Sequence, residues 1–248
     1  FRSLTATGQE EMHRDFNPLL PGFLYTPAND CEALKALVAE HDDIAAIMFE
    51  LVQGEGGVMP LERAFVDCMA ELAAEKDILL VCDEVQTGNG RTGSLYAWQQ
   101  YGFTPDIMST AKGLGGGLPI GACLFGEKTE NTLTPGTHGS TFGGSPAVCA
   151  GALSILGRID EALLAQVRAK SEYLFSAFEG RPGIEQVSGL GLMIGIRTAK
   201  PAAEVVAKCM EQGVLVLTAH GKVRLLPALN IPMELVKKAA EVIIAACA

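Results

Sequence analysis

Hydrophobic residues in the first half of the chain follow two patterns that alternate along the sequence. Some form short continuous apolar runs, which are typical of strands buried on both faces of a sheet. Others recur every three or four residues, which is typical of amphipathic helices. The predicted strands lie within residues 44–52, 78–85, 106–117 and 120–128, and the predicted helices at 31–41 and 61–76. Strands that alternate with helices through short connections predict an α/β fold with a mostly parallel sheet covered by helices.

The pattern changes near Ser145. Residues 145–180 are almost entirely helical in spacing, and the rest of the chain alternates strand-like and helical segments. Strands are predicted within 184–198, 214–220 and 222–229, and helices at 201–212 and from Pro232 to the end. We therefore expect two domains: residues 1–146, part of a larger domain, and residues 147–248, a smaller α+β domain.

Composition narrows the class of protein. The chain has 248 residues, of which 48% are hydrophobic and 28 are glycine, a profile typical of α/β enzymes. Its net charge of −10 and the absence of a Lys/Arg cluster argue against nucleic-acid binding. No apolar run reaches transmembrane length and no signal peptide is recognisable, so we expect a cytoplasmic protein without a membrane partner. Because Phe1 is not a natural start, we also expect that the chain begins inside a longer gene product.

The seven cysteines are odd in number and form no CxxC pair. Several lie in apolar runs, so we expect reduced, buried thiols rather than disulfides or a zinc site. The four histidines also lack the spacing of metal ligands, and no metal is predicted.

Polar residues follow three consecutive predicted strands at their carboxyl ends. Glu50 lies near the end of the first strand, Asp83 and Glu84 end the second, and Lys112 follows the third before a glycine run. Ligands of open parallel sheets bind at this edge, so these side chains are expected to share one crevice. Each residue alone is more often a cap, a turn or a solvated side chain, but their order together predicts a site.

Two chemistries place acids at a strand end. A nucleotide hydrolase holds magnesium there, but it also needs a G-x-x-x-x-G-K-[ST] loop, which this chain lacks. That interpretation survives only if an upstream segment carries the loop. A pyridoxal-phosphate enzyme needs a lysine amine for the Schiff base and an acid facing the pyridine nitrogen. Lys112 and Asp83 meet that need, and Gln86 could contact the phenolic oxygen of the ring.

The segment "LVCDEVQTGNGRTGSLYAWQQYGFTPDIMSTAKGLGGGLPIGACL" resembles the class III, ornithine-type aminotransferases of fold-type I. Further matching motifs are "FELVQGEGGV", "THGSTFGGSP", "GLGLMIGI" and "VRLLPAL", in the same order along the chain. The resemblance is strongest to the acetylornithine branch. It implies pyridoxal 5'-phosphate as cofactor, a homodimer with shared active sites, and amino transfer from N-acetylornithine to 2-oxoglutarate, which leaves as glutamate. Ornithine, succinylornithine, succinyldiaminopimelate or 4-aminobutyrate remain alternative donors, and a catalytically silent homologue is a third possibility.

The resemblance also implies roles for individual residues. Lys112 would be the Schiff-base lysine and proton carrier, and Asp83 would hold the pyridine nitrogen. Arg224 would bind the substrate α-carboxylate, and Glu55 would pair with that arginine and release it for the second substrate. The resemblance implies further contacts to the cofactor from Glu84, Val85 and Gln86, although Glu84 has no assigned catalytic task. In the site of the neighbouring subunit, Thr141 would bind the cofactor phosphate and Ser140 would lie beside the substrate.

The chain departs from the family pattern in two ways. Leu51 stands where the family usually has proline, which removes no functional group. The second departure is that this sequence does not contain the family's phosphate-cupping loop, its ring-stacking aromatic residue or its "HGR" arginine. In the family these features lie upstream of the segment that corresponds to "FRSLTATGQ".

Overall fold

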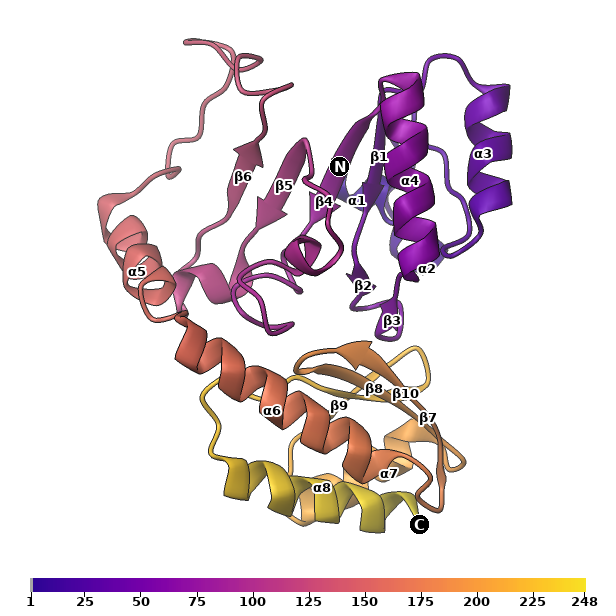
Figure 1. The fold of residues 1–248 in the computed structure, drawn as a ribbon, viewed down its shortest axis with the longest axis vertical. Helices are drawn as coiled ribbons and strands as arrows, with labels where there is room; N and C mark the ends of the chain where they lie inside the picture. The colour runs from indigo at the N-terminus through magenta and orange to yellow at the C-terminus, as the bar shows by residue number, and fades with distance from the viewer. Residues whose placement is uncertain (1) are drawn as a thin grey trace. The chain divides into compact units, whose positions relative to one another are not determined.

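The computed structural model describes residues 2–248 (Figure 1). Contacts between residues divide the chain into two compact units. The first unit contains the residues up to Met48 together with Leu61–Leu80, and the second contains Phe49–Pro60 and Val81–Ala248. These units follow spatial contacts, so they do not test the domain boundary predicted at residue 146. No helix within the described residues is both long and apolar enough to cross a membrane.

The first unit consists of short helices and the beginning of a sheet. Its elements are α1 (Arg2–Ala6), α2 (Glu10–His13), α3 (Cys31–Glu40), most of β1 (Ala46–Phe49), α4 (Arg63–Lys76) and the start of β4 (Leu79–Asp83). Helices α3 and α4 begin and end close to the predicted bounds, because their apolar spacing is a local property of the sequence. Strand β1, however, alternates exposed and half-buried side chains, so the prediction of burial on both faces is wrong for it. Its successive side chains point to opposite faces, and Met48 remains 51% exposed.

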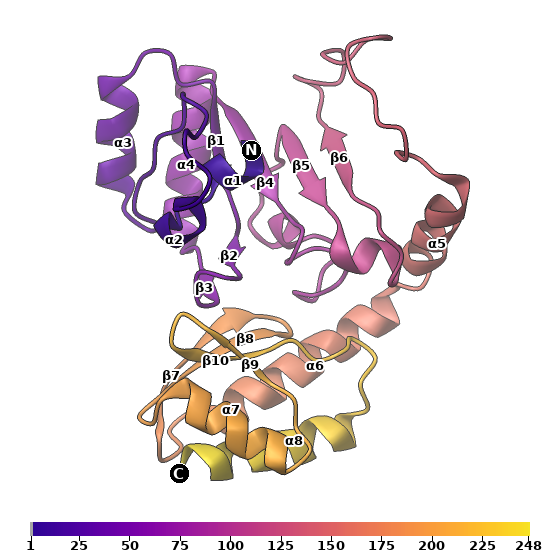
Figure 2. The same cartoon turned by 180° about the vertical axis from the view of Figure 1, so that it is seen from behind.

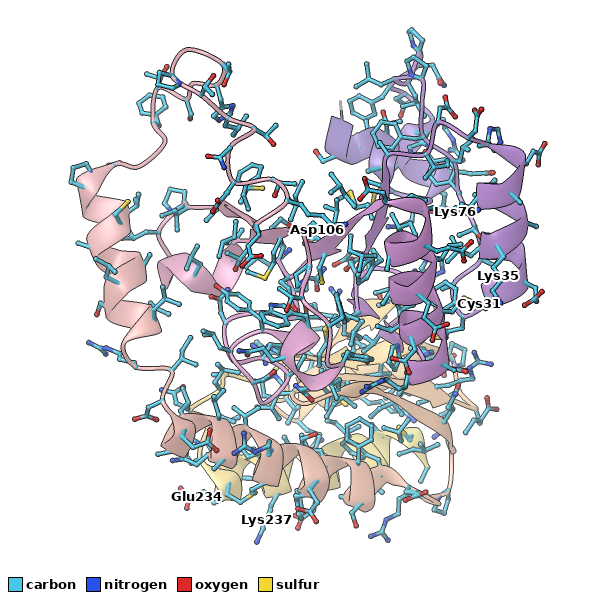
Figure 3. All side chains as sticks on the ribbon, turned by 45° about the horizontal axis from the view of Figure 1, so that its top comes forward. Cys31, Lys35, Lys76, Asp106, Glu234 and Lys237 are labelled. Carbon is cyan, nitrogen blue, oxygen red and sulfur yellow. A yellow bond between two sulfur atoms is a disulfide. The ribbon has the colours of Figure 1, made fainter. Side chains whose placement is uncertain are left out.

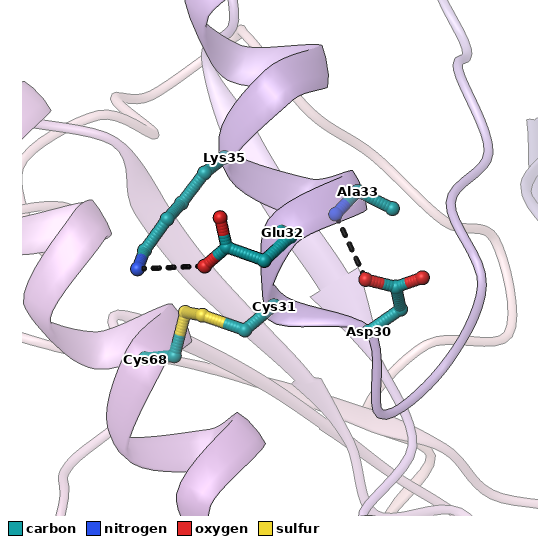
Figure 4. Close-up of a disulfide and its surroundings, with 6 residues drawn as sticks. All are labelled: Asp30, Cys31, Glu32, Ala33, Lys35 and Cys68. Carbon is teal, nitrogen blue, oxygen red and sulfur yellow. Dashed lines mark hydrogen bonds and ion pairs between the residues drawn. A yellow bond between two sulfur atoms is a disulfide. The ribbon is translucent and has the colours of Figure 1, made fainter.

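A disulfide joins helices α3 and α4. Cys31 is the first residue of α3, and its Cα lies 6.3 Å from that of Cys68 in α4, within the usual range for a bridge (Figure 4). The prediction that all seven cysteines are reduced is therefore wrong for this pair. Sequence spacing did not reveal it because the two residues are 37 positions apart and meet only through helix packing.

This bridge predicts the number of accessible thiols in the unfolded, unreduced protein. Alkylation in denaturant without reductant is expected to label five cysteines, and labelling after reduction should reach all seven. Mass spectrometry of the alkylated protein measures the difference. A matched Cys31→Ser variant should show the same number of labels with and without reductant. Seven labels on the unreduced wild-type protein would contradict the bridge.

Two strands of the four-stranded sheet, β5 (Ile107–Thr110) and β6 (Ala122–Phe125), belong wholly to the second unit. Strand β4 pairs in parallel with β5, as predicted, and β5 pairs antiparallel with β6, giving the strand order β1-β4-β5-β6. A parallel neighbour needs a long crossover, usually a helix. The connection from β5 to β6 is instead a turn around η2 (Lys112–Gly115), so β6 returns in the opposite direction.

The second unit also contains a second sheet and the helices that follow the first one. The strand order of this second sheet is β7-β8-β10-β9, and all of its pairs are antiparallel. Helices α6, α7 and α8 pack against one face of it through a continuous apolar core (Figures 1 and 2). Glu234 and Lys237 of α8 project away from that core (Figure 3). The elements are α5 (Pro146–Leu156), α6 (Glu161–Phe178), β7 (Ile184–Leu190), β8 (Met193–Thr198), α7 (Ala202–Glu211), β9 (Leu217–Ala219), β10 (Lys222–Leu225) and α8 (Met233–Cys247).

Two smaller elements complete the second unit. Strands β2 (Val52–Gln53) and β3 (Met59–Pro60) form a short antiparallel hairpin, which we call the β2–β3 hairpin. The short helix η1 (Ala97–Gln100) closes the loop that follows β4. Both elements carry or support residues of the site described next.

Candidate functional site

The end of strand β4 presents Asp83 in a defined geometry. The side chain is half-buried, and its Oδ1 accepts hydrogen bonds from the backbone N–H of Val85 at 2.9 Å and from Ser109 Oγ at 3.0 Å. Ser109 stands opposite Asp83 in the register between β4 and β5. Because both bonds reach one oxygen, Oδ2 is available to a further donor such as a protonated ring nitrogen. Sequence reasoning missed Ser109, because its contact depends on strand register.

Lys112 follows the next strand tip. It begins η2 with a φ of +47°, a left-handed conformation that non-glycine residues seldom adopt. The buried Asn89 holds this corner in place, since its Nδ2 donates to Thr110 Oγ1 and to the Ala111 carbonyl, each at 3.1 Å. The Lys112 side chain itself is exposed, so its amine is free to move.

Glu50 shows that these groups lie close enough to affect one another. Burial raises its pKa, the backbone hydrogen bond from Gly54 to its Oε2 lowers it, and the charges of Asp83 and Lys112 act in opposite directions. Glu50, Asp83 and Lys112, which end or follow three predicted strands, therefore all lie in the second unit, with Asp83 and Lys112 within electrostatic range of Glu50. Glu50 has no role in the resemblance, and its side chain is half-buried.

Gln86 connects this group to the hairpin that follows Glu50. Its Nε2 donates to Glu55 Oε1 over 3.5 Å, a long contact. A side chain at position 54 would place its Cβ 2.4 Å from Gln86 Oε1, so this close approach requires glycine there. Gly54 in "QGEGG" thus lets the amide of Gln86 lie against the backbone of the hairpin.

Glu55 and Arg224 form an ion pair. Arg224 Nη1 lies 2.7 Å from Glu55 Oε1, and the arginine side chain is 9% exposed while the glutamate is 52% exposed. The hydrogen bond from Arg224 lowers the pKa of Glu55, so the pair persists at pH values below the usual glutamate range. Arg224 Nε is buried and makes no hydrogen bond within the described residues. The pairing expected from the resemblance is present, and the guanidinium keeps a free donor.

Glu84 points into a different environment from Asp83. It is fully buried, its Oε2 accepts from Thr87 Oγ1 at 2.6 Å, and its Oε1 accepts from the backbone N–H of Trp98 at 2.8 Å. Burial raises the pKa of this carboxyl group. With both oxygens committed to the loop up to η1, Glu84 cannot join Asp83 as a pair of magnesium ligands. We interpret it as a structural residue of that loop.

Arg91 ties the same loop to the second sheet. Its Nη1 donates to the carbonyl oxygens of Leu192 at 3.1 Å and Pro227 at 2.6 Å. Burial lowers the pKa of this guanidinium to about 10. Pro227 lies three residues after Arg224, so Arg91 links the loop after the Asp83 strand to the segment that carries the candidate carboxylate-binding residue.

Ser140 and Thr141 lie apart from this group. Both are exposed in the long segment between β6 and α5, where Gly143 N–H donates to the Ser140 carbonyl in a turn. No contact joins them to Asp83, Gln86 or Lys112 within the described chain, which agrees with an expected place in a neighbouring subunit's site without testing it. Within residues 2–248, no group of three or more His, Cys, Asp or Glu side chains is placed so that it could hold a metal.

Comparisons with known proteins identify the family of the chain. The family model described as "Aminotransferase class-III" matches residues 1–247. Acetylornithine aminotransferase of Haemophilus ducreyi is 46% identical over 97% of this chain and 62% of its own length, and that of Aquifex aeolicus is 42% identical over 98% and 64%. The chain therefore spans about three fifths of the length of these curated relatives.

Two solved structures resemble the chain in fold. Ornithine aminotransferase of Toxoplasma gondii ME49 has a TM-score of 0.92 and 32% identity, covering 98% of this chain and 60% of its own. N-acetylornithine aminotransferase of Stenotrophomonas maltophilia K279a has a TM-score of 0.82 and 37% identity, covering 92% and 62%. These likenesses confirm the fold class that the sequence predicts, α/β of the fold-type I kind.

Proposed function

Because the chain belongs to the class-III aminotransferases, we propose that the protein transfers the terminal amino group of N-acetylornithine to 2-oxoglutarate with pyridoxal 5'-phosphate as cofactor. The observation that carries this proposal is the state of Asp83, whose Oδ1 is held by Val85 and Ser109 while Oδ2 is available beside the strand tip that bears Lys112. Membership of this family excludes the nucleotide-hydrolase interpretation of Asp83 and Glu84.

The donor set fits the cofactor. A carboxylate with an available oxygen suits a pyridinium nitrogen, an exposed lysine amine suits the aldehyde, and the Gln86 amide suits the phenolic oxygen. When bound, pyridoxal phosphate supplies an electron sink for the negative charge that forms at the reacting carbon. Asp83 would keep the ring nitrogen protonated, and Val85 would lie against the ring. The Lys112 amine would hold the cofactor and would accept and return the proton that is transferred.

The pair formed by Arg224 and Glu55 lets one site accept two different substrates. With the donor bound through its terminal amine, Glu55 neutralises the buried guanidinium, which otherwise lacks a partner for its charge. When 2-oxoglutarate enters, its α-carboxylate takes Arg224 in a bidentate pair and Glu55 moves aside. The exposed side of Glu55 gives it room to do so.

A homodimer with shared active sites is part of the proposal. Thr141 would bind the cofactor phosphate and Ser140 would lie beside the substrate in the neighbouring subunit. The exposed segment between β6 and α5 supports this, because Phe142 within it is 88% exposed.

A donor panel tests the substrate. Full-length protein is mixed with acetylornithine, ornithine, succinylornithine, succinyldiaminopimelate or 4-aminobutyrate, and glutamate formation from 2-oxoglutarate is measured. We expect the highest kcat/KM for acetylornithine, because relatives of that name are 40–46% identical. Ornithine is the second candidate, since an ornithine aminotransferase has a TM-score of 0.92. Preference for ornithine would replace the substrate assignment, and no transfer from any donor would refute the proposal.

The Glu55→Gln variant tests whether Glu55 neutralises Arg224 while the amino donor is bound. The amide cannot neutralise the guanidinium, so Arg224 becomes available to any α-carboxylate. We expect kcat/KM for glutamate as donor to rise about 10-fold relative to acetylornithine, the size of a lost hydrogen bond between charged groups. Steady-state rates for each donor measure the ratio, and an unchanged ratio would show that Glu55 does not mask Arg224.

A further inference from the structure

The β2–β3 hairpin, which carries Glu55 in its turn, packs on the face of the second sheet opposite helices α6–α8. Val58 is fully buried against Val52 and Met193, and its φ of +52° is rare for a β-branched residue. A Cβ at Gly195 of β8 would lie 2.9 Å from Val58 Cβ, so glycine permits this approach. The position of the hairpin is therefore specified closely by the sheet beneath it.

A buried polar contact holds the hairpin at the same place. Ser188 Oγ of β7 donates to the Val58 carbonyl at 2.8 Å, and Lys222 Nζ of β10 donates to Ser188 Oγ at 2.9 Å. The Lys222 amine also lies 3.0 Å from Met59 Sδ. Lys222 thus contacts the hairpin directly through Met59 and indirectly through Ser188.

Lys222 is an unusual residue for this position. It is only 4% exposed, and both partners of its amine are uncharged. Burial, and then the neighbouring Arg197, lower its pKa. Burying a lysine without a carboxylate partner costs free energy, and the two hydrogen bonds of the Lys222 amine to the hairpin side of the sheet offset part of that cost.

The same two elements carry both members of the Glu55–Arg224 pair. Arg224 lies two residues after Lys222, so both side chains leave β10 on the same face. Glu55 lies three residues before Val58 in the turn of the hairpin. The hairpin and β10 are thus joined at two points, by Lys222 with Ser188 at one and by the ion pair at the other.

We propose that Lys222, acting with Ser188, is a positioning residue that fixes the β2–β3 hairpin so that Glu55 meets Arg224. Its consequence for catalysis rests on the proposed function. If Lys222 no longer held the hairpin, Glu55 would spend less time on Arg224, and the enzyme would discriminate less between a donor bound by its terminal amine and an α-amino acid.

The first test does not depend on activity. In full-length protein, Lys222→Met keeps the length of the side chain but removes its hydrogen bonds. Hydrogen exchange of peptides that span residues 52–60 is expected to become about 10-fold faster, as for loss of one hydrogen bond to a charged group. Lys170→Met is the matched control: Lys170 is also buried, but its amine donates to the Leu229 carbonyl. It should leave exchange in the hairpin unchanged. Unchanged exchange in Lys222→Met, or equal acceleration in both variants, overturns the proposal.

The second test asks whether Lys222 acts through Glu55. In a double-mutant cycle, Lys222→Met alone should raise the glutamate-to-acetylornithine ratio of kcat/KM about 10-fold, in the same direction as Glu55→Gln. In the Glu55→Gln background it should change that ratio less than twofold. Additive effects overturn the proposal. If wild-type protein transfers no amino group, the proposed function fails, and the exchange experiment still decides whether Lys222 holds the hairpin.

Discussion

Replacing Lys112 by alanine in the full-length protein is expected to lower turnover by about four orders of magnitude or more, because one amine both holds the cofactor and carries the proton. The same change should abolish the visible absorption of covalently held cofactor. Lysine and alanine both carry a Cβ, so the substitution adds no strain to the left-handed backbone at position 112 and the fold should tolerate alanine. Absorption spectra and single-turnover rates measure the two losses separately.

Two further measurements show that the Lys112 effect is chemical. Lys76→Ala removes a lysine that is about half exposed on α4, and it should leave the spectrum and the rate unchanged. A small free amine such as methylamine should restore part of the Lys112→Ala activity, since it replaces the missing proton carrier. A Lys112→Ala protein that kept both the absorption and the rate would remove Lys112 from the reaction.

Local pattern in the sequence is sufficient to predict the elements that present the site. The apolar run that ends at Cys82 forms a strand whose buried side chains are Leu80 and Cys82, and it delivers Asp83 to the edge of the sheet as expected. The turn at Lys112 follows from the glycine run behind it. Both features depend on residues within a few positions of each other, so they can be predicted from a single sequence.

Contacts between distant segments are what the sequence does not reveal. Ser109 reaches Asp83 only because β4 and β5 pair in one register, and a shift by one residue would turn Ser109 to the other face. Lys222 reads as a surface lysine by residue type, but the hairpin that packs over the second sheet buries it. No local pattern in the sequence predicts either contact. Each contact nevertheless holds a residue that the sequence does identify: Ser109 holds Asp83, and Lys222 holds the hairpin that carries Glu55.

The direction of β6 is a further feature that the sequence pattern did not predict. Four consecutive strand-like runs predict a mostly parallel sheet, yet β6 pairs antiparallel with β5. Only eleven residues separate Thr110 from Ala122, and the glycine run occupies part of them, so no crossover helix fits. The same turn that exposes Lys112 therefore also reverses the chain.

Asp83→Asn is expected to lower turnover by about two to three orders of magnitude, the usual effect of removing one preorganised electrostatic group. Asparagine preserves an Oδ1 that can accept from Val85 N–H and Ser109 Oγ, so the strand tip should keep its geometry. What changes is the charge that keeps the ring nitrogen protonated. The covalent absorption that depends on Lys112 should therefore remain while the single-turnover rate falls.

Comparing Asp83→Ala with Asp83→Asn separates the effect of the charge from the effect of the Oδ1 contacts. It removes the charge and both Oδ1 contacts, so turnover should fall at least as far as in Asp83→Asn, with weaker retention of cofactor. Ser109→Ala is the matched control, because it removes one contact to Oδ1 and leaves the charge. Its loss should stay within about tenfold, as for one hydrogen bond. Equal losses in Ser109→Ala and Asp83→Asn would mean that Asp83 acts by position alone, whereas a wide gap between them assigns the effect to its charge on the ring nitrogen.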